Sequence, residues 1–195
     1  PASVLTDEDA PPPVSVKSGN LDVKTFVVLG EGLAAGMGDF SLSEESQITS
    51  FSALLGRQFG TEFNQPLLEA PGLGDLAGFP ELPVRVPALL QTTGLSEFPP
   101  THAVHNLSIP GYHLEDALQR RPIEPLVHRS DAKQTLTNMT LGMPDMIHEG
   151  DGPLMTQLEY ALRWHPTVSV VELGYHEVVE AAVAQGPDAL PDLKT

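Results

Sequence analysis

The sequence contains no cysteine, few basic residues and no long apolar run. With no cysteine among 195 residues, disulfides, thiolate metal sites and a cysteine nucleophile are excluded. Ten Lys and Arg residues against 26 Asp and Glu residues give a formal net charge of −16, which repels phosphate backbones and anionic lipids. We therefore expect no nucleic-acid partner. No apolar run reaches the ~18 residues that a membrane-spanning helix needs, so no membrane span is expected.

The composition changes at Thr25, which divides the chain into an arm and a domain. Residues 1–24 are mostly polar, include the prolines at 11–13 and lack helix or strand periodicity. They are interpreted as an extended N-terminal arm. Residues 25–195 are assigned to one α/β domain, and a domain of this size buries enough surface to fold without a disulfide.

Short apolar runs alternate with helical patterns along this domain. Residues 25–29, 103–107 and 168–173 are rich in valine and leucine and end at glycine or turn residues, which predicts strands. Helices are predicted at 51–60, 114–120, 154–164 and 178–184, and loops at 61–101 and 121–152. Alternating strands and helices indicate a parallel sheet flanked by helices on both faces. In such sheets the functional residues follow the strands' carboxyl ends.

The three loops after these runs contain the chemistry-bearing residues. They read Gly-Glu-Gly-Leu-Ala-Ala-Gly at 30–36, Asn-Leu-Ser-Ile-Pro-Gly at 106–111, and Gly-Tyr-His-Glu at 174–177. Their order and spacing resemble the SGNH/GDSL-type esterase family, in a bacterial subgroup, and the resemblance covers residues 25–193. It implies a flavodoxin-like three-layer fold, of which the chain holds the N-terminal portion and lacks the C-terminal part.

The family's catalytic residues are replaced in this chain. Where the resemblance places the nucleophilic serine there is Gly32, preceded by Glu31 in place of aspartate. The oxyanion-hole asparagine is replaced by His176 and the acid after it by Glu177, while Gly111 matches the family's hole-forming glycine. An acyl-enzyme mechanism needs an activated nucleophile, so no catalytic residue is assigned.

One Asp-x-x-His string, Asp145 to His148, resembles the family's C-terminal catalytic pair. It precedes the third loop instead of following it, and we interpret it as a chance match in a surface loop. The sequons at Asn106 and Asn138 are also interpreted as chance matches. The glycine pattern at 30–36 lacks the Lys-Ser/Thr ending of a phosphate loop, so no nucleotide cofactor is expected.

Glu31, His113, His176 and Glu177 are the candidate pocket residues, since all four are expected to face the former active site. Two imidazoles and two carboxylates can bind a divalent metal. They can also fill the vacated pocket by hydrogen bonds and ion pairs. The second interpretation is favoured, because no tight spacing such as His-x-x-x-His fixes a ligand set, and no metal or other cofactor is expected.

These observations predict a catalytically degenerate, esterase-like protein that serves as a binding or assembly subunit. One alternative is an active hydrolase of lipid or acyl-sugar esters with an unidentified nucleophile. Another is a carbohydrate- or peptide-binding module. A protein partner or a second copy is expected to complete the sheet. The resemblance to bacterial proteins favours an exported, periplasmic or cell-surface location.

Overall fold

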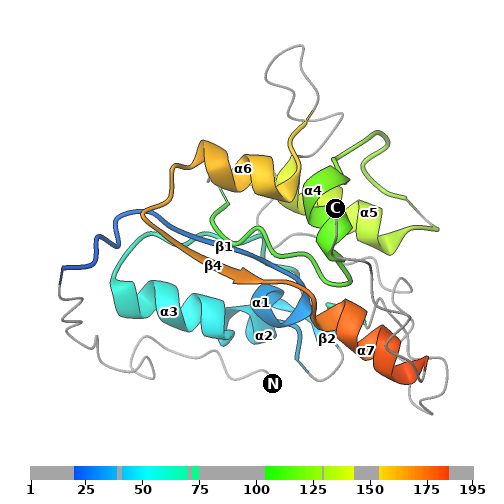
Figure 1. Cartoon of the computed structure of the whole chain (residues 1–195), viewed down its shortest axis with the longest axis horizontal. Coiled ribbons are helices and arrows are strands. Elements are labelled where there is room, and N and C mark those ends of the chain that lie inside the picture. The colour runs from blue at the N-terminus through cyan, green and yellow to red at the C-terminus, as the bar shows by residue number, and fades with distance from the viewer. Residues whose placement is uncertain are drawn as a thin grey trace.

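A computed structural model of the chain describes residues 20–38, 41–69, 72–74, 104–128, 130–142 and 154–184. This part is a mixed α/β structure with a small parallel sheet. Strand β1 (Phe26–Gly30) pairs in parallel with β4 (Val168–Glu172), and Gly30 lies opposite Glu172. A second, antiparallel pair joins β2 (Ser41–Leu42) to β3 (Leu73–Gly74). Figure 1 shows β1 and β4 side by side between α6 and α3.

The second predicted strand lies along the other edge of β1. Val28 donates its N–H to the carbonyl of His105 at 3.0 Å, and Leu107 donates to the carbonyl of Val28 at 2.8 Å. The prediction that the three segments are adjacent and parallel is therefore confirmed. The segment forms a single bridge at Asn106 instead of a regular strand. The Asn106 side chain accepts the N–H of Ser108, a local bond that competes with the ladder.

Seven helices surround these strands in the described residues. They are α1 (Gly32–Ala35), α2 (Glu44–Ile48), α3 (Phe51–Phe59), α4 (Leu114–Gln119), α5 (Ala132–Leu141), α6 (Gln157–Arg163) and α7 (Tyr175–Val183). The predicted helices correspond to α3, α4, α6 and α7, with bounds that differ by up to three residues. Sharp ends explain this agreement: Ser50 caps α3, Thr156 caps α6, and a left-handed Gly60 ends α3.

The two faces of β1 pack against different helices. Val27 and Leu29 belong to a buried cluster with side chains from α4, α5 and α6, whereas Phe26 and Val28 pack with Ala34 of α1 and side chains of α3. This alternation is the two-residue period of a strand that is covered on both sides. All five residues of β1 are buried, so β1 is the centre of the fold.

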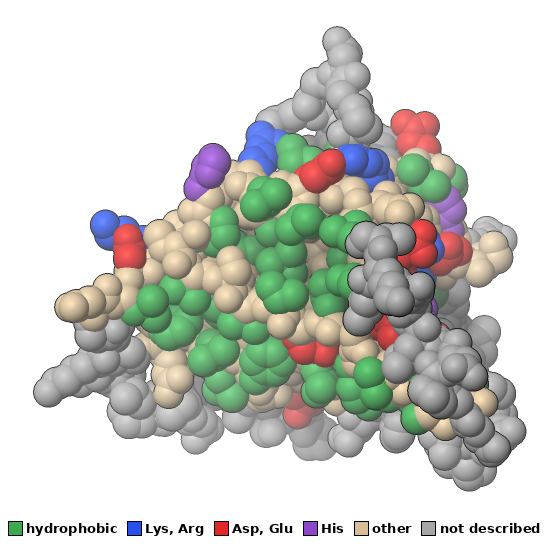
Figure 2. Space-filling model, viewed as in Figure 1, with side chains coloured by type: hydrophobic (Ala, Val, Ile, Leu, Met, Phe, Trp, Pro, Cys, Tyr) green, Lys and Arg blue, Asp and Glu red, His purple; other side chains and the backbone are tan. Residues whose placement is uncertain are grey.

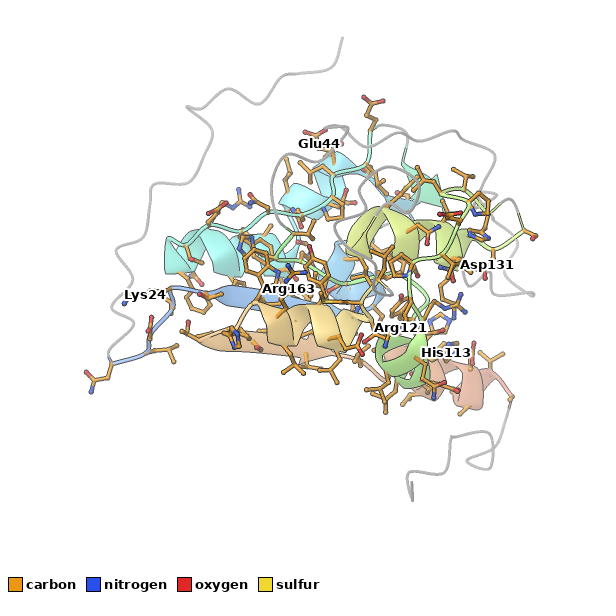
Figure 3. The ribbon with its side chains drawn as sticks, turned by 90° about the horizontal axis from the view of Figure 1, so that it is seen from above. Lys24, Glu44, His113, Arg121, Asp131 and Arg163 are labelled. Atoms are coloured by element: carbon orange, nitrogen blue, oxygen red, sulfur yellow. The ribbon has the colours of Figure 1, made fainter. Side chains whose placement is uncertain are left out.

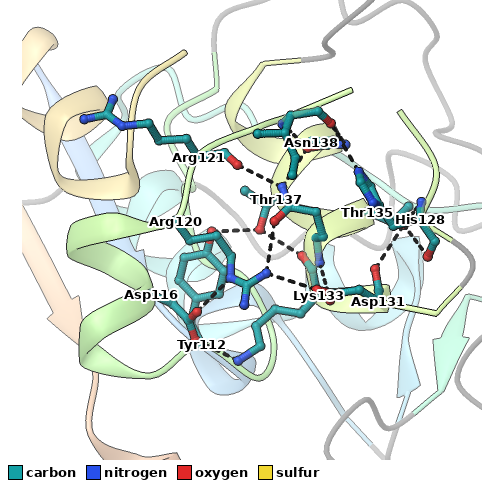
Figure 4. Close-up of polar contacts among 12 residues, drawn as sticks. Tyr112, Asp116, Arg120, Arg121, His128, Asp131, Lys133, Thr135, Thr137 and Asn138 are labelled. Carbon is teal, nitrogen blue, oxygen red and sulfur yellow. Dashed lines mark hydrogen bonds and ion pairs between the residues drawn. The ribbon is translucent and has the colours of Figure 1, made fainter. Parts of the chain in front are cut away.

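Helix α5 lies in a stretch that the sequence predicted to be a loop, and that prediction is wrong. The buried face of α5 is mostly polar, so it has no apolar periodicity to detect. Asn138 is fully buried and donates its amide N–H groups to carbonyls of the preceding loop, those of Ile123, Pro125 and Leu126, at 2.8–3.0 Å. Figure 4 shows Asn138 with Thr137 and Thr135 of the same helix, whose hydroxyls bond to Tyr112 and to His128. Hydrogen bonds take the place of apolar packing here.

Both sequons have buried asparagine amides. The Asn106 amide donates to the carbonyl of Ala34 at 2.9 Å and to the side chain of Gln65 at 3.1 Å. Asn106 and Asn138 are 2% and 0% exposed. A glycan cannot occupy either nitrogen in this fold.

An apolar band covers one face of the molecule. Figure 2 shows hydrophobic side chains gathered over β4 and its neighbouring helices. Val171 of β4, Leu162 of α6 and Val178 of α7 are 64%, 61% and 59% exposed. Among the described residues, no strand pairs with the outer edge of β4. No helix in this part of the chain is both long and apolar enough to cross a membrane.

Two of the sequence-based assignments concern residues that lie largely or wholly outside the described part of the chain. Most of the predicted N-terminal arm lies outside the described residues, as does the Asp145 to His148 string.

Candidate functional site

The site lies where the three parallel segments end. Gly30 ends β1 opposite Glu172 of β4, and its carbonyl accepts the N–H of Ile109 at 3.0 Å. Gly111 and Gly174 follow within a few residues and both have positive φ angles, 78° and 97°. These turns direct the chain from the sheet edge into α4 and α7. Figure 3 shows His113 where α4 meets α7.

Glu31 directly follows β1 and caps α7 from inside the protein. Its Oε1 atom accepts the N–H of Tyr175 at 2.8 Å and the N–H of His176 at 3.3 Å. The side chain is only 1% exposed. Burial raises the pKa of Glu31 to about 7, helped by the nearby Glu172 carboxylate and opposed by the two N–H donors.

Glu172 has the mirror-image role at the end of β4. Its Oε2 atom accepts the N–H of Glu31 at 3.3 Å and the N–H of Ala34 at 3.1 Å, in the first turn of α1. Burial raises the pKa of Glu172 as well. Helix α1 has no cap from its own Glu31, so Glu172 supplies the missing acceptor.

Glu177 caps a third helix that starts at this site. Its Oε1 atom accepts the N–H of Leu114, the first residue of α4, at 2.6 Å. A carboxylate therefore lies at the N-terminus of α1, α4 and α7, where it satisfies free N–H groups and the positive end of the helix dipole. These glutamates are structural parts of the site.

Glu180 and two histidines meet at the surface of the site. His113 Nε2 lies 3.1 Å from one carboxylate oxygen of Glu180, and His176 Nε2 lies 3.6 Å from the other. The two imidazole rings are 5.1 Å apart and nearly perpendicular. Burial lowers the pKa of His176 despite the opposing effect of Glu180.

Asp116 links His113 to the polar network of α5, of which Figure 4 shows Asp116, Arg120 and Lys133. Its carboxylate accepts from Lys133 Nζ at 2.7 Å and from Arg120 Nε at 2.7 Å. It also accepts the N–H of His113 at 3.0 Å and lies 3.4 Å from His113 Nδ1. Burial acts to raise the pKa of Asp116, but the bonds from Lys133, His113 and Arg120 hold it well below its usual value.

A hollow of about 300 Å³ opens beside these groups. It is lined by Gly111, His113, Ser130, Asp131, Ala132, Lys133, His176 and Glu180. The lining is mostly polar and charged, and it combines residues of both signs. The hollow therefore suits a small polar ligand or an ion better than an acyl chain.

The predicted pocket residues end up at the same end of the sheet, in different roles. His113 and His176 line the hollow, while Glu31 and Glu177 bind backbone N–H groups behind it. Gly111 also lines the hollow, and Gly32 starts α1 without lining it.

Sequence reasoning missed Glu180, Asp116 and Lys133. Glu180 follows His176 by four residues on a helix, a spacing that places both side chains on one face. That spacing was visible in the sequence. Lys133 had no such signal, because α5 was itself not predicted.

The comparisons with known proteins add no family. No protein-family model matches the chain, and neither a curated protein nor a solved structure matches it.

Proposed function

We propose that this chain is a catalytically degenerate, SGNH-like α/β protein with a three-layer arrangement, acting as a binding or assembly subunit. One observation carries the proposal. The position that corresponds to the nucleophile in the resemblance is Gly32, which has no side chain, and the acids beside it are used as helix caps. Without the nucleophile, the hydrogen-bond donors that a serine mechanism uses to stabilise the oxyanion give only weak residual catalysis.

The polar hollow supports a binding role. It offers imidazole, ammonium and carboxylate groups next to one another, from His113, His176, Lys133 and Glu180. Such groups orient a small polar ligand by hydrogen bonds. The proposed ligand class is therefore small and polar rather than a lipid.

The test is serine-directed chemistry. Purified protein is incubated with a fluorophosphonate probe and with short acyl esters, beside an active serine esterase. We expect neither labelling nor turnover. Stoichiometric labelling of one serine would overturn the proposal.

Ser130 favours the alternative of an active hydrolase and makes it testable. Among the described residues it is the one serine that lines the hollow, together with His113 and His176. None of the serines in the described part of the chain is hydrogen-bonded to a histidine, which a general base requires. If esterase activity is found, Ser130→Ala should abolish it and the exposed Ser169→Ala should not.

The apolar band supports the assembly role. Val171 and Leu162 expose more than half of their surface, on a face that ends at the outer edge of β4. Exposed apolar area and an unpaired strand edge are features that proteins cover with partners. We propose that a second protein chain, identical or different, adds to this edge.

Light scattering on the purified chain tests the identical case, and Val171→Lys is the matched variant. A dimer that Val171→Lys dissociates is the expected result. Two results together would overturn the assembly role: the purified chain stays monomeric at high concentration, and no partner copurifies with it from its source.

A further inference from the structure

Two histidines and one glutamate direct their outer atoms to a common point beside the hollow. One ligand atom each from His113, His176 and Glu180 lies within 4.8 Å of the others. His113 Nε2 lies 3.1 Å from Glu180 Oε2, and His176 Nε2 lies 3.6 Å from the other oxygen, Oε1. In a tetrahedral zinc site with bonds of about 2.0–2.1 Å, ligand atoms lie about 3.3 Å apart. Small side-chain rotations therefore suffice to form the site.

The inner nitrogen of each histidine faces a carboxylate. His113 Nδ1 is 3.4 Å from Asp116 Oδ2, and His176 Nδ1 is 3.6 Å from Glu31 Oε2. Histidines that bind a metal through Nε2 donate Nδ1–H to a carboxylate in this way, which fixes the tautomer and the ring orientation. At His113, Lys133 Nζ lies 3.3 Å from the same ring nitrogen and 2.7 Å from Asp116 Oδ2. The Nδ1–H tautomer of His113 therefore requires that Lys133 donate to Asp116 and not to the ring.

Glu31 Oε2 is an independent sign of a ligand. The Glu31 side chain is 99% buried, and this oxygen has no hydrogen-bond partner among the described residues. A buried carboxylate oxygen without a partner is costly. His176 Nδ1 lies 3.6 Å from this oxygen. An Nδ1–H group there would satisfy it once the ring moves slightly closer, and metal binding at Nε2 selects that tautomer.

The charges around the site favour a cation. Glu180 contributes a carboxylate directly, with Glu31 and Asp116 behind the histidines. Lys133 is the opposing charge that lines the hollow, and its Nζ donates to Asp116 at 2.7 Å. That ion pair compensates the ammonium charge close to the site.

We propose that His113, His176 and Glu180 bind one divalent transition-metal ion, with zinc as the expected occupant, while Asp116 and Glu31 orient the two histidines. Two imidazoles and one carboxylate suit zinc and leave a fourth position open. That position faces the hollow, where a water or a ligand atom completes the coordination. The sequence led us to expect no metal, because no tight spacing such as His-x-x-x-His fixes a ligand set.

The experiment is a metal titration of the whole chain after chelator treatment. Calorimetry with Zn²⁺ should give one equivalent per chain. Co²⁺ should give the visible absorption of a four-coordinate site, which Zn²⁺ then removes. Absence of 1:1 binding would overturn the proposal.

Matched variants locate the ion. His176→Asn and Glu180→Gln should abolish 1:1 binding, whereas the exposed His165→Asn and Glu115→Gln should leave it unchanged. Glu31→Gln should weaken binding about 10–100-fold, the usual effect of losing a group that orients a ligand. Far-UV circular dichroism confirms that each variant folds. Binding that survives both ligand variants would also overturn the proposal.

The metal site and the proposed function fail in different ways. Zinc-dependent ester hydrolysis would leave the metal site standing and overturn the non-catalytic role. A chain that binds no metal and does not react with fluorophosphonate would overturn the metal site and leave the non-catalytic role standing.

Discussion

The carboxylates of Glu31 and Glu172 each cap the helix that follows the other's strand. Glu31 follows β1 and binds the first N–H groups of α7, while Glu172 ends β4 and binds N–H groups at the start of α1. The two strands pair directly at this point. The exchange ties both strand-to-helix turns together, so each turn depends on a residue about 140 positions away in the sequence.

Loss of the Glu31 acceptor should destabilise the fold. Glu31→Ala leaves the N–H groups of Tyr175 and His176 without their acceptor, and a lost helix cap costs about 0.5–2 kcal/mol. Glu31→Gln keeps an acceptor oxygen and should cost less. Urea unfolding followed by circular dichroism, in the presence of a chelator, measures both. Equal stability of Glu31→Ala and the wild type would contradict the capping role.

Glu172 should make the protein less stable as the pH rises. Burial raises the pKa of Glu172 in the folded state above its ordinary value of 4.5. The folded chain then holds the proton more tightly than the unfolded chain. Its stabilising contribution is complete below about pH 4.5 and is lost as the pH rises through the folded-state pKa.

Glu172→Gln should therefore flatten the dependence of the melting temperature on pH above about 4.5. Thermal melts in a chelator-containing buffer series measure this slope. The exposed Glu45→Gln is the control, and its slope should match that of the wild type. A Glu172→Gln slope equal to that of the wild type would contradict the assignment.

Gly30 and Gly32 should respond differently to the same substitution. A Cβ atom on Gly30 would lie 2.7 Å from the Cβ of Ala34 and 2.8 Å from the carbonyl of Glu172. Gly30→Ala should therefore cost about 1–3 kcal/mol, the usual range for overpacking. A Cβ on Gly32 would meet only Met37, at 3.6–3.7 Å. Gly32→Ala should be neutral or slightly stabilising, because alanine favours the helix.

Denaturant unfolding of the two glycine variants gives the comparison. Equal losses of stability would show that the close approach of α1 to β4 does not determine the cost of a side chain at Gly30. Gly32→Ser belongs to the same series. It should fold, because the space for a side chain exists, and it should remain without esterase activity.

Asn138→Ala should be among the most destabilising changes in the chain. The amide donates to three loop carbonyls and is fully buried. A buried carbonyl left without its partner costs about 1–3 kcal/mol, so a loss of at least about 2 kcal/mol is expected. The exposed Gln119→Ala on α4 serves as the control. A loss below about 0.5 kcal/mol would show that water replaces the amide at little cost.

The sequence was informative wherever apolar periodicity or sharp caps mark an element. The runs around Val27 and Val170 identified β1 and β4, and Phe51, Leu55 and Phe59 identified α3. Helix α5 was not predicted, because its buried face contains the polar residues Gln134, Thr137 and Asn138. Such residues pack only when distant carbonyls and hydroxyls meet them, which local patterns do not show.

The candidate site was also predictable only in part. The strand-end rule places His176 and Glu31 at the same edge of the sheet, and the structure has them 3.6 Å apart. The rule does not give the function of each side chain. That Glu31 binds backbone while Glu180 meets both histidines depends on the angle between α4 and α7, which follows from packing of the whole domain.

The buried amides of Asn106 and Asn138 have a consequence for how the protein is made. Oligosaccharyltransferase modifies an extended chain before it folds, and both sequons are intact in the sequence. A sugar on Asn106 would separate the first helix from the sheet, and one on Asn138 would expel the loop that holds the fifth helix. Passage through a eukaryotic secretory pathway would therefore trap the chain before it folds, whereas a bacterial host leaves both nitrogens free to be buried.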